Sequence, residues 1–340
     1  MEDVLSSVIG WSRRTLASWH PDVSFSVPAH QPNQDASSRN KSGLRVREIT
    51  PADFHRVAEL LGEGIGFSNQ YFLDLLQRMT QHSTPAGFPK YGRLLESDGS
   101  IVGAIILIFS TIWSDGIPSI RCQVTGWCVE PAYRCYAAVF FGRDLKHNGV
   151  TYINTSAKSD TLRVIQTQGF TQYSSGQFRV VPAIQFASRD NQVKVRGVDE
   201  VPNARFETFE QELLLTHAKC GCICLWCVTA ERAYPFAFRP RIFRRFLPGA
   251  QLVYCRDIED FVRFVAPIGR FLASRGRFVV RVDSNGPIDG LVGTFIEGVD
   301  CRYYKGPEPP RLGDLAYTNF AMCTYVPWRK KPQTLSPASK

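Results

Sequence analysis

The sequence has no apolar segment long enough to cross a membrane as a helix. Its longest apolar runs, counting glycine as apolar, are the nine-residue segments Ile101–Phe109 and Cys220–Val228. A membrane-spanning helix needs about 20 such residues. The first residues include Glu2 and Asp3 and lack the apolar stretch and small-residue cleavage site of a secretory signal. We therefore expect a cytoplasmic protein without a membrane span.

Sequence motifs of several enzyme classes are also missing. The 340 residues contain no P-loop and no nucleophile elbow. The glycine-rich run at 62–66 follows a predicted helix, whereas a dinucleotide-binding fingerprint must follow a strand. Cysteine, at ten residues, is too sparse for a disulfide scaffold, and cytoplasmic thiols stay reduced. The composition, 44% apolar and 21% charged, is that of a folded chain of about two domains.

Four cysteines, Cys220, Cys222, Cys224 and Cys227, come closest to a metal-binding pattern. The first three alternate with apolar residues, which is typical of a buried strand. Residues two apart in a strand are separated by about 6.6 Å, too far for two sulfurs whose bonds to one zinc are only ~2.3 Å long. We therefore predict that these thiols pack in the core and hold no metal, with zinc binding as the alternative.

Basic residues outnumber acidic ones by 40 to 31, which gives a net charge of +9. Thirty of the basic residues are arginine, whose planar guanidinium binds phosphate or carboxylate in a fork. This balance is compatible with an anionic ligand but does not identify one. A GC-rich genome explains the excess of arginine equally well.

Composition divides the chain into five segments. Residues 1–43 form an N-terminal extension, either an amphipathic helix over 1–22 or unordered chain, and a polar linker from Pro28. We place two domains at 44–186 and 206–328, a linker without periodicity at 187–205, and a disordered tail at 329–340.

The first domain is predicted to follow the order β-α-α-β-β-β-α-β-α-β. Its strands are expected at Leu44–Ile49, Tyr91–Glu96, Ile101–Ile112, Ile120–Val129, Val150–Asn154 and within Phe170–Phe186. Its helices are expected at Pro51–Leu61, ended by Gly62, at Asn69–Met79, at Arg134–His147 and at Ser159–Gln168.

The second domain repeats part of this order. It is expected to contain a helix at Phe206–Lys219, the cysteine-rich strand, a strand at Ala250–Arg256, a helix capped by Asp257 and kinked at Pro267, and a strand at Phe278–Asp283. In both halves a strand, a crossover helix and a glycine stop follow one another with the same spacing, from Val129 to Gly149 and from Arg256 to Gly276. The spacing predicts an internal duplication.

One stretch of the first half resembles a known family. Val129-Glu130-Pro131-Ala132-Tyr133-Arg134 is similar to the V-x-P-x-x-R stretch before the acyl-CoA loop of the GNAT (GCN5-related N-acetyltransferase) superfamily. Gly103 and the Gly169-Phe170 pair stand where that family carries G and GF. The resemblance covers residues 44–186 and implies a mixed α/β (α+β) GNAT-like fold, with the second half as a degenerate copy in tandem. It further implies a monomer with pseudo-dimeric halves.

The resemblance also implies a binding site for acetyl-CoA or another acyl-CoA. Backbone N–H groups at a helix N-terminus hold a pyrophosphate, and the pantetheine arm lies against the strand before it. The residues carried over for this cofactor site are Trp127, Cys128, Val129, Arg134, Cys135, Tyr136, Ala137, Ala138 and Val139.

Several residues depart from the family pattern. Ala137 and Val139 replace glycines that let phosphate approach the backbone. Ile165 stands where the family often has a general-acid tyrosine, and Lys158 where an asparagine is common. No catalytic residue is therefore assigned. Tyr133, Tyr136, Tyr152 and Tyr173 are candidates for the acid and Glu130 for the base, whereas His147 and His217 are interpreted as structural.

Two classes of function follow from the sequence. The first is an acyl-CoA-dependent acyltransferase, in which a small-molecule or peptide amine attacks the thioester directly. The second is a GNAT-fold protein without catalysis that binds a ligand or partner, as the missing tyrosine and glycines suggest.

A third reading rests on arginines interleaved with phenylalanines, Arg239, Arg241, Arg244 and Arg245. Such a cluster suits single-stranded nucleic acid, and the layout is similar to that of Fem-type aminoacyl transferases, which use aminoacyl-tRNA. We instead expect a strand edge protected by arginines and no nucleic-acid partner.

Overall fold

The computed structural model describes residues 43–114, 116–157, 159–185, 193–243 and 246–323. The predicted helix at 1–22, the linker from Pro28 and the tail at 329–340 lie outside these residues, as do Lys158, Arg244 and Arg245. Residues 43–323 belong to one compact unit.

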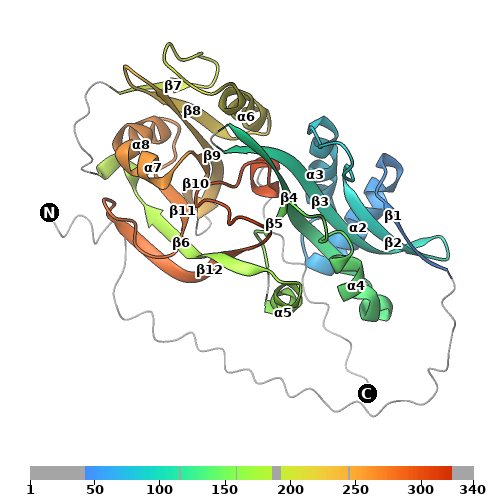
Figure 1. The fold of residues 1–340 in the computed structure, drawn as a ribbon. Helices are drawn as coiled ribbons and strands as arrows, with labels where there is room; N and C mark the ends of the chain where they lie inside the picture. The colour runs from blue at the N-terminus through green and yellow to red at the C-terminus, as the bar shows by residue number, and fades with distance from the viewer. Residues whose placement is uncertain (1–42, 115, 158, 186–192, 244–245, 324–340) are drawn as a thin grey trace, which may run out of the picture. The chain divides into compact units, whose positions relative to one another are not determined.

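A single mixed sheet runs through the described residues, in the order β1-β2-β3-β4-β5-β12-β6-β11-β10-β9-β8-β7 (Figure 1). The first-half strands are β1 (Leu44–Glu48), β2 (Gly92–Ser97), β3 (Ser100–Ser114), β4 (Ile117–Val129), β5 (Val150–Asn154) and β6 (Thr171–Val180). The second-half strands are β7 (Lys194–Gly197), β8 (Ile223–Val228), β9 (Ala233–Phe243), β10 (Leu247–Cys255), β11 (Val279–Ser284) and β12 (Gly293–Lys305).

Helices connect many of these strands along the chain and pack against the sheet. The α-helices are α2 (Phe54–Ile65), α3 (Asn69–Gln81), α4 (Ala137–Gly142), α5 (Ser159–Thr167), α6 (Thr208–Lys219), α7 (Ile258–Arg263), α8 (Val265–Ala273) and α9 (Asn319–Met322). The 3₁₀ turns are η2 (Pro51–Asp53), η3 (Pro131–Tyr136) and η4 (Pro182–Ile184). No helix in the described part of the chain is long and apolar enough to cross a membrane.

The two halves exchange their last strands. Read from its outer edge, the first half runs β1-β2-β3-β4-β5 and then borrows β12, while the second runs β7-β8-β9-β10-β11 and then borrows β6. The pairs β4·β5 and β10·β11 are parallel, and β12 is antiparallel to both β5 and β6. The two halves therefore have the same strand order, mirrored about the β12–β6 pair, and neither half completes its sheet alone.

The core follows the two-residue period of the strands. In β3, Ala104, Ile106 and Ile108 pack with α2 and α3, whereas Ile105, Leu107 and Phe109 face the opposite side with α4. Alternate side chains of a strand point to opposite faces, and both faces of this strand are buried. This explains why residues 101–109 form one of the two longest apolar runs.

Most predicted elements are present, with several corrections. α2 runs past Gly62 and ends at Gly66, whose φ of 85° suits glycine. The predicted helix over Arg134–His147 is instead η3 followed by the six-residue α4. Strand β7 lies within the predicted linker at 187–205, and β6 is a single strand. Of β9 only an arginine-protected strand edge was expected, and β12 was not predicted as a strand.

Two local predictions are confirmed. The helix capped by Asp257 breaks at Phe264 into α7 and α8, because Pro267 offers no N–H to the carbonyl of Arg263. Cys222 and Cys224 pack on one face of the sheet and Cys227 on the other. Cys220, which was expected in the same strand, is instead half-buried at the end of α6. Within the described ranges, no group of three or more histidine, cysteine or acidic residues is arranged to hold a metal ion, and the expectation that these thiols hold no metal stays a prediction.

Candidate active site

The strands β4 and β5 separate in the middle of the first half. They are paired from Ile120 to Gln123 of β4, opposite Val150 to Ile153 of β5. Beyond Gln123, β4 continues to Val129. Across the described residues, no backbone hydrogen bond joins the β5-facing edge of Val124–Val129 to another segment. The parallel pair thus opens into a splay whose β4 edge has unused backbone groups.

A β-bulge shapes this edge. Thr125 pairs with Ile106 and Cys128 with Ala104, so Gly126 and Trp127 together stand opposite Ile105. Gly126 has a φ of 55°, which a residue with a side chain rarely adopts. A Cβ atom there would also lie 3.2–3.3 Å from side chains of three core residues. The bulge is therefore tied to glycine at this position.

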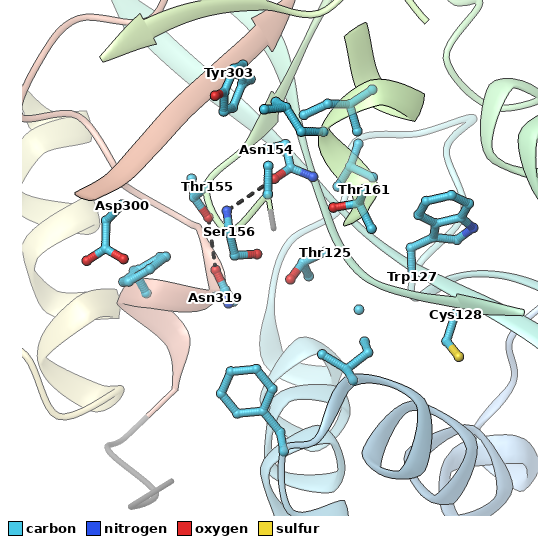
Figure 2. Close-up of a pocket in the computed structure, with 18 of the residues that line it drawn as sticks. Thr125, Trp127, Cys128, Asn154, Thr155, Ser156, Thr161, Asp300, Tyr303 and Asn319 are labelled. Carbon is cyan, nitrogen blue, oxygen red and sulfur yellow. Dashed lines mark hydrogen bonds between the residues drawn. The ribbon is translucent and has the colours of Figure 1, made fainter. Parts of the chain in front are cut away.

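The splay opens into a cavity of about 1240 Å³. Figure 2 shows Thr125, Trp127 and Cys128 on its β4 side, opposite Asp300 and Asn319 from the second half. The α2–α3 region contributes Gly64, Ile65, Phe67, Tyr71 and Phe72. The end of β5 and the segments after it contribute Asn154, Thr155, Ser156, Ala157, Thr161, Leu162, Val164 and Ile165. The second half contributes Arg239, Arg241, Ile242, Gly298, Asp300, Cys301, Tyr303, Asn319 and Phe320.

Buried amides close the narrow end of the splay. Gln123 accepts a hydrogen bond from the backbone N–H of Asn319 and donates to the Thr155 hydroxyl at 2.7 Å. Asn319 donates through Nδ2 to the Tyr71 hydroxyl at 2.8 Å, and Figure 2 marks its contact with Thr155. Four segments far apart in sequence therefore meet at this point.

The second half has an equivalent splay, which the chain itself fills. β10 and β11 are paired only from Gly249 to Gln251 of β10. Beyond this, the N–H of Leu315 donates to the carbonyl of Val253 at 2.7 Å, and the N–H of Cys255 donates to the carbonyl of Gly313 at 3.1 Å. The edge that is open in β4 is thus hydrogen-bonded in β10.

Comparison with known proteins identifies the fold of this chain. No protein-family model and no curated protein matches the sequence. Among solved structures, the chain is similar to a GCN5-related N-acetyltransferase from Anabaena variabilis. The TM-score is 0.53 at 12% identity, over 77% of this chain and 72% of that one. The chain has the GCN5-related N-acetyltransferase fold. The predicted GNAT-like fold is confirmed.

Two other similar structures have lower scores. A putative acetyltransferase from Pyrococcus horikoshii aligns with a TM-score of 0.47 at 13% identity, over 83% of this chain and 96% of that one. Eis1 from Mycobacterium abscessus aligns with a TM-score of 0.46 at 13% identity, over 80% and 74%.

The predicted cofactor residues lie in two settings of this GNAT fold. Five of them line the cavity, Trp127, Cys128, Val129, Arg134 and Ala137. The other four, Cys135, Tyr136, Ala138 and Val139, are exposed to solvent around the turn η3 and the start of α4, with Val139 76% exposed. The assignment stays a prediction, now centred on the five lining residues.

The acid and base candidates taken from the sequence lie away from the cavity lining. Glu130, Tyr133 and Tyr136 are near the turn η3. The Tyr152 hydroxyl accepts from the backbone N–H of His147, and Tyr173 is buried.

The cavity is instead lined by two other tyrosines, Tyr71 and Tyr303. Burial raises the pKa of both phenols, so they stay protonated near neutral pH. Tyr71 lies on the apolar stripe of a predicted helix, which marks a core residue, and Tyr303 lies in a strand that was not predicted. Neither could be recognised as a cavity residue from the sequence.

The arginine-rich segment is not a sheet edge. β9 lies between β8 and β10, and the exposed edge of this half is β7. Arg239 and Arg241 line the cavity of the GNAT fold, where their guanidinium groups lie 5.4 and 5.8 Å from the ring centre of Phe320. The expectation of a protective edge is therefore wrong for Arg239 and Arg241, because β9 pairs with β8 on one edge and with β10 on the other.

Proposed function

We propose that the protein transfers an acyl group from an acyl-CoA to an amine. The unpaired β4 edge beside the cavity carries the proposal, because an extended amide-containing arm can hydrogen-bond there as a neighbouring strand would. The second half supports the same idea. Its equivalent edge is occupied by Gly313–Leu315, which forms hydrogen bonds with Val253 and Cys255 of β10.

The pantetheine arm would lie along Trp127–Val129, with its thioester directed toward Thr125. The phosphates would remain near the wide end, beside the exposed side chain of Arg134. A guanidinium binds phosphate through charge-assisted hydrogen bonds, each worth about 1.5–3 kcal/mol. The exposed setting of η3 predicts weak binding of the phosphates themselves.

The reaction is a direct acyl transfer. The neutral amine attacks the thioester carbonyl carbon, a C–N bond forms, and the C–S bond breaks. The amine gives up one proton, and the leaving CoA thiolate takes up one, so the products are an amide and free CoA. The acceptor would enter on the side of α2 and α3, opposite the turn η3.

Calorimetric titration with CoA and acetyl-CoA tests the proposal. Arg134→Ala should weaken CoA binding roughly ten- to a hundredfold, the effect of losing one charge-assisted contact. Arg143→Ala, also exposed and nine positions along the chain, is the control and should bind as the wild type does. A folded wild type that binds no CoA at millimolar ligand would refute the proposal.

Ligand binding without catalysis is the second candidate. Ile165 is buried and lines the cavity, so the helix α5 offers no proton donor at this position. A protein that binds acetyl-CoA but releases no free CoA in the presence of amines would belong to this class.

A further inference from the structure

Two arginines of β9 project from the same face of the sheet into the cavity. Arg239 and Arg241 are two residues apart, and alternate residues of a strand share a face. Both guanidinium groups lie over the ring of Phe320, and that of Arg302 lies 4.7 Å from the same ring centre. The cavity wall therefore gathers positive charge around one aromatic side chain.

The neighbouring arginines are neutralised by carboxylates. Arg281 pairs with Asp300 at 2.6 Å, and Arg302 pairs with Asp283 at 2.9 Å. Arg239 and Arg241 have no ion pair with any residue that the structure describes. These four guanidinium groups are thus matched by two carboxylates, which leaves an excess of two positive charges.

Both arginines also bury donors that have no acceptor. The Nε of Arg239 and the Nη1 of Arg241 are shielded from solvent, and no hydrogen-bond partner for either lies in the described part of the chain. A buried donor without a partner costs about 1–3 kcal/mol, and more when the group is charged. Such donors are satisfied when a ligand supplies oxygen atoms.

The electrostatic environment agrees with this geometry. The pKa of Arg241 is lowered to about 10, first by burial and then by the charges of Arg239 and Arg281. Each of these causes disfavours the protonated guanidinium. An anion bound beside the two side chains would compensate both.

The arginine pair lies near the closed end of the splay. Phe320 directly follows Asn319, which hydrogen-bonds Gln123 at the closed end of the splay. Arg134 lies beyond the other end of the β4 edge, and the six residues from Gln123 to Val129 span about 20 Å. One basic site is therefore available at each end of the cavity.

We propose that Arg239 and Arg241 bind an oxyanion, carboxylate or phosphate, carried by the amine that accepts the acyl group. This inference rests on the proposed acyl transfer for its reaction but not for its binding site. The site selects amines with an acidic group over neutral amines of the same length.

Paired acceptors test the selectivity. Release of free CoA from acetyl-CoA is measured with two amines that carry an acidic group, β-alanine and phosphoethanolamine, here called anionic for that group. Their counterparts without it, β-alanine amide and ethanolamine, are here called neutral. We expect kcat/KM to be at least tenfold higher for an anionic amine than for its neutral counterpart. In the double variant Arg239→Gln/Arg241→Gln, kcat/KM should fall more for the anionic amines than for the neutral ones, so that the preference is lost. A misfolded protein would instead lose both activities in the same proportion.

Direct binding separates this inference from the acyltransferase proposal. Phosphate or acetate at 10 mM (about the range in which a weak site fills) should raise the melting temperature of the wild type by a few degrees over chloride at equal ionic strength. Arg134→Ala should keep this response, and the double variant should lose it. Two results would overturn the inference and leave the acyl transfer standing. The first is CoA binding with equal kcat/KM for anionic and neutral amines. The second is a rise in melting temperature that is as large in the double variant as in the wild type. Absence of CoA binding with a retained thermal response would refute the acyl transfer alone.

Discussion

The backbone N–H of Leu315 and the carbonyl of Val253 are joined by a 2.7 Å hydrogen bond in the splay of the second half. Leu315 is almost completely buried there. Asp257 and Glu259 follow this edge, at the place that the turn after β4 occupies in the first half. The second half therefore combines a filled splay with acidic side chains that repel phosphate.

We predict that each chain binds one CoA. Displacing Gly313–Leu315 would break backbone hydrogen bonds and expose a buried leucine, which costs more than a pantetheine arm returns. Calorimetric titration should give a stoichiometry near one. A stoichiometry of two would show that Gly313–Leu315 leaves its position when ligand binds.

Gly126→Ala should destabilise the protein. The residue has a φ of 55°, and a left-handed conformation costs a residue with a Cβ atom about 1–2 kcal/mol. The added methyl group would also press on Leu61, Phe72 and Ile106. Urea unfolding should show a lower midpoint than that of the wild type. Calorimetric titration of the folded variant should show weaker CoA binding.

Gly197→Ala is the matched control, because its Cβ atom would meet open space in the edge strand β7. Its free energy of unfolding should differ from that of the wild type by no more than ordinary surface substitutions cause, about 0.5 kcal/mol. Equal losses in the two variants would mean that the bulge does not require glycine.

His217 should make stability fall under acidic conditions. Its ring is buried, with Nδ1–H donating to the carbonyl of Leu213 at 2.7 Å and Nε2 accepting from the N–H of Tyr317 at 3.0 Å. Protonation of Nε2 would remove that acceptor. The pKa of His217 is lowered to about 4, chiefly by burial.

The direction of the effect follows from linkage. As pH falls, the unfolded chain takes up a proton near pH 6.5, whereas the folded chain does so only near pH 4. The stability contributed by neutral His217 is complete above pH 6.5 and is lost between pH 6.5 and 4, by about 3 kcal/mol. Asp260 acts oppositely, because burial raises its pKa to about 6.

The comparison must therefore be made between variants. His217→Gln should lower stability at pH 7.5 and reduce the difference in urea midpoint between pH 7.5 and pH 5. His55→Gln, on the exposed side of α2, should leave that difference unchanged. If His217→Gln keeps the full wild-type difference in urea midpoint between the two pH values, other groups cause the effect. The first candidate is His82, because burial also lowers its pKa.

The ion pair of Arg302 with Asp283 should couple β12 to β11 energetically. Both side chains are buried, and removing one partner from a buried pair costs about 3–5 kcal/mol. We expect Arg302→Met and Asp283→Leu each to lower stability by that order, and the double variant to lose much less than the sum. The exposed pair of Arg56 with Glu59 should show a coupling below about 1 kcal/mol. Additive losses at Arg302 and Asp283 would exclude the coupling.

Local patterns predicted the elements whose structure depends on neighbouring residues. Strand β5 has the bounds expected from the sequence, and the break at Phe264 follows from Pro267. The elements that were missed depend on distant partners. β12 is polar along much of its length and is held between β5 and β6, which no local period reveals.

The candidate site was only partly predictable for the same reason. The motif at Val129–Arg134 located the β4 edge, because those residues are consecutive in the chain. Asn319 and Arg239 join the cavity through tertiary pairing alone. Two arginines in a phenylalanine-rich strand are typical of a solvated surface, and here they line the cavity.

The exchange of β6 and β12 also fixes an order of events during translation. The strands β1 to β6 have all been synthesised once the chain reaches Val180. At that point β5 still lacks its second neighbour, because β12 (Gly293–Lys305) is synthesised later. At about 5–20 residues per second, this interval lasts on the order of ten seconds. The edge of β5 stays open to pairing with other chains during that time. The time for which β5 offers an open edge is therefore set by the rate of synthesis over this stretch, and the finished protein exposes no such edge at β5.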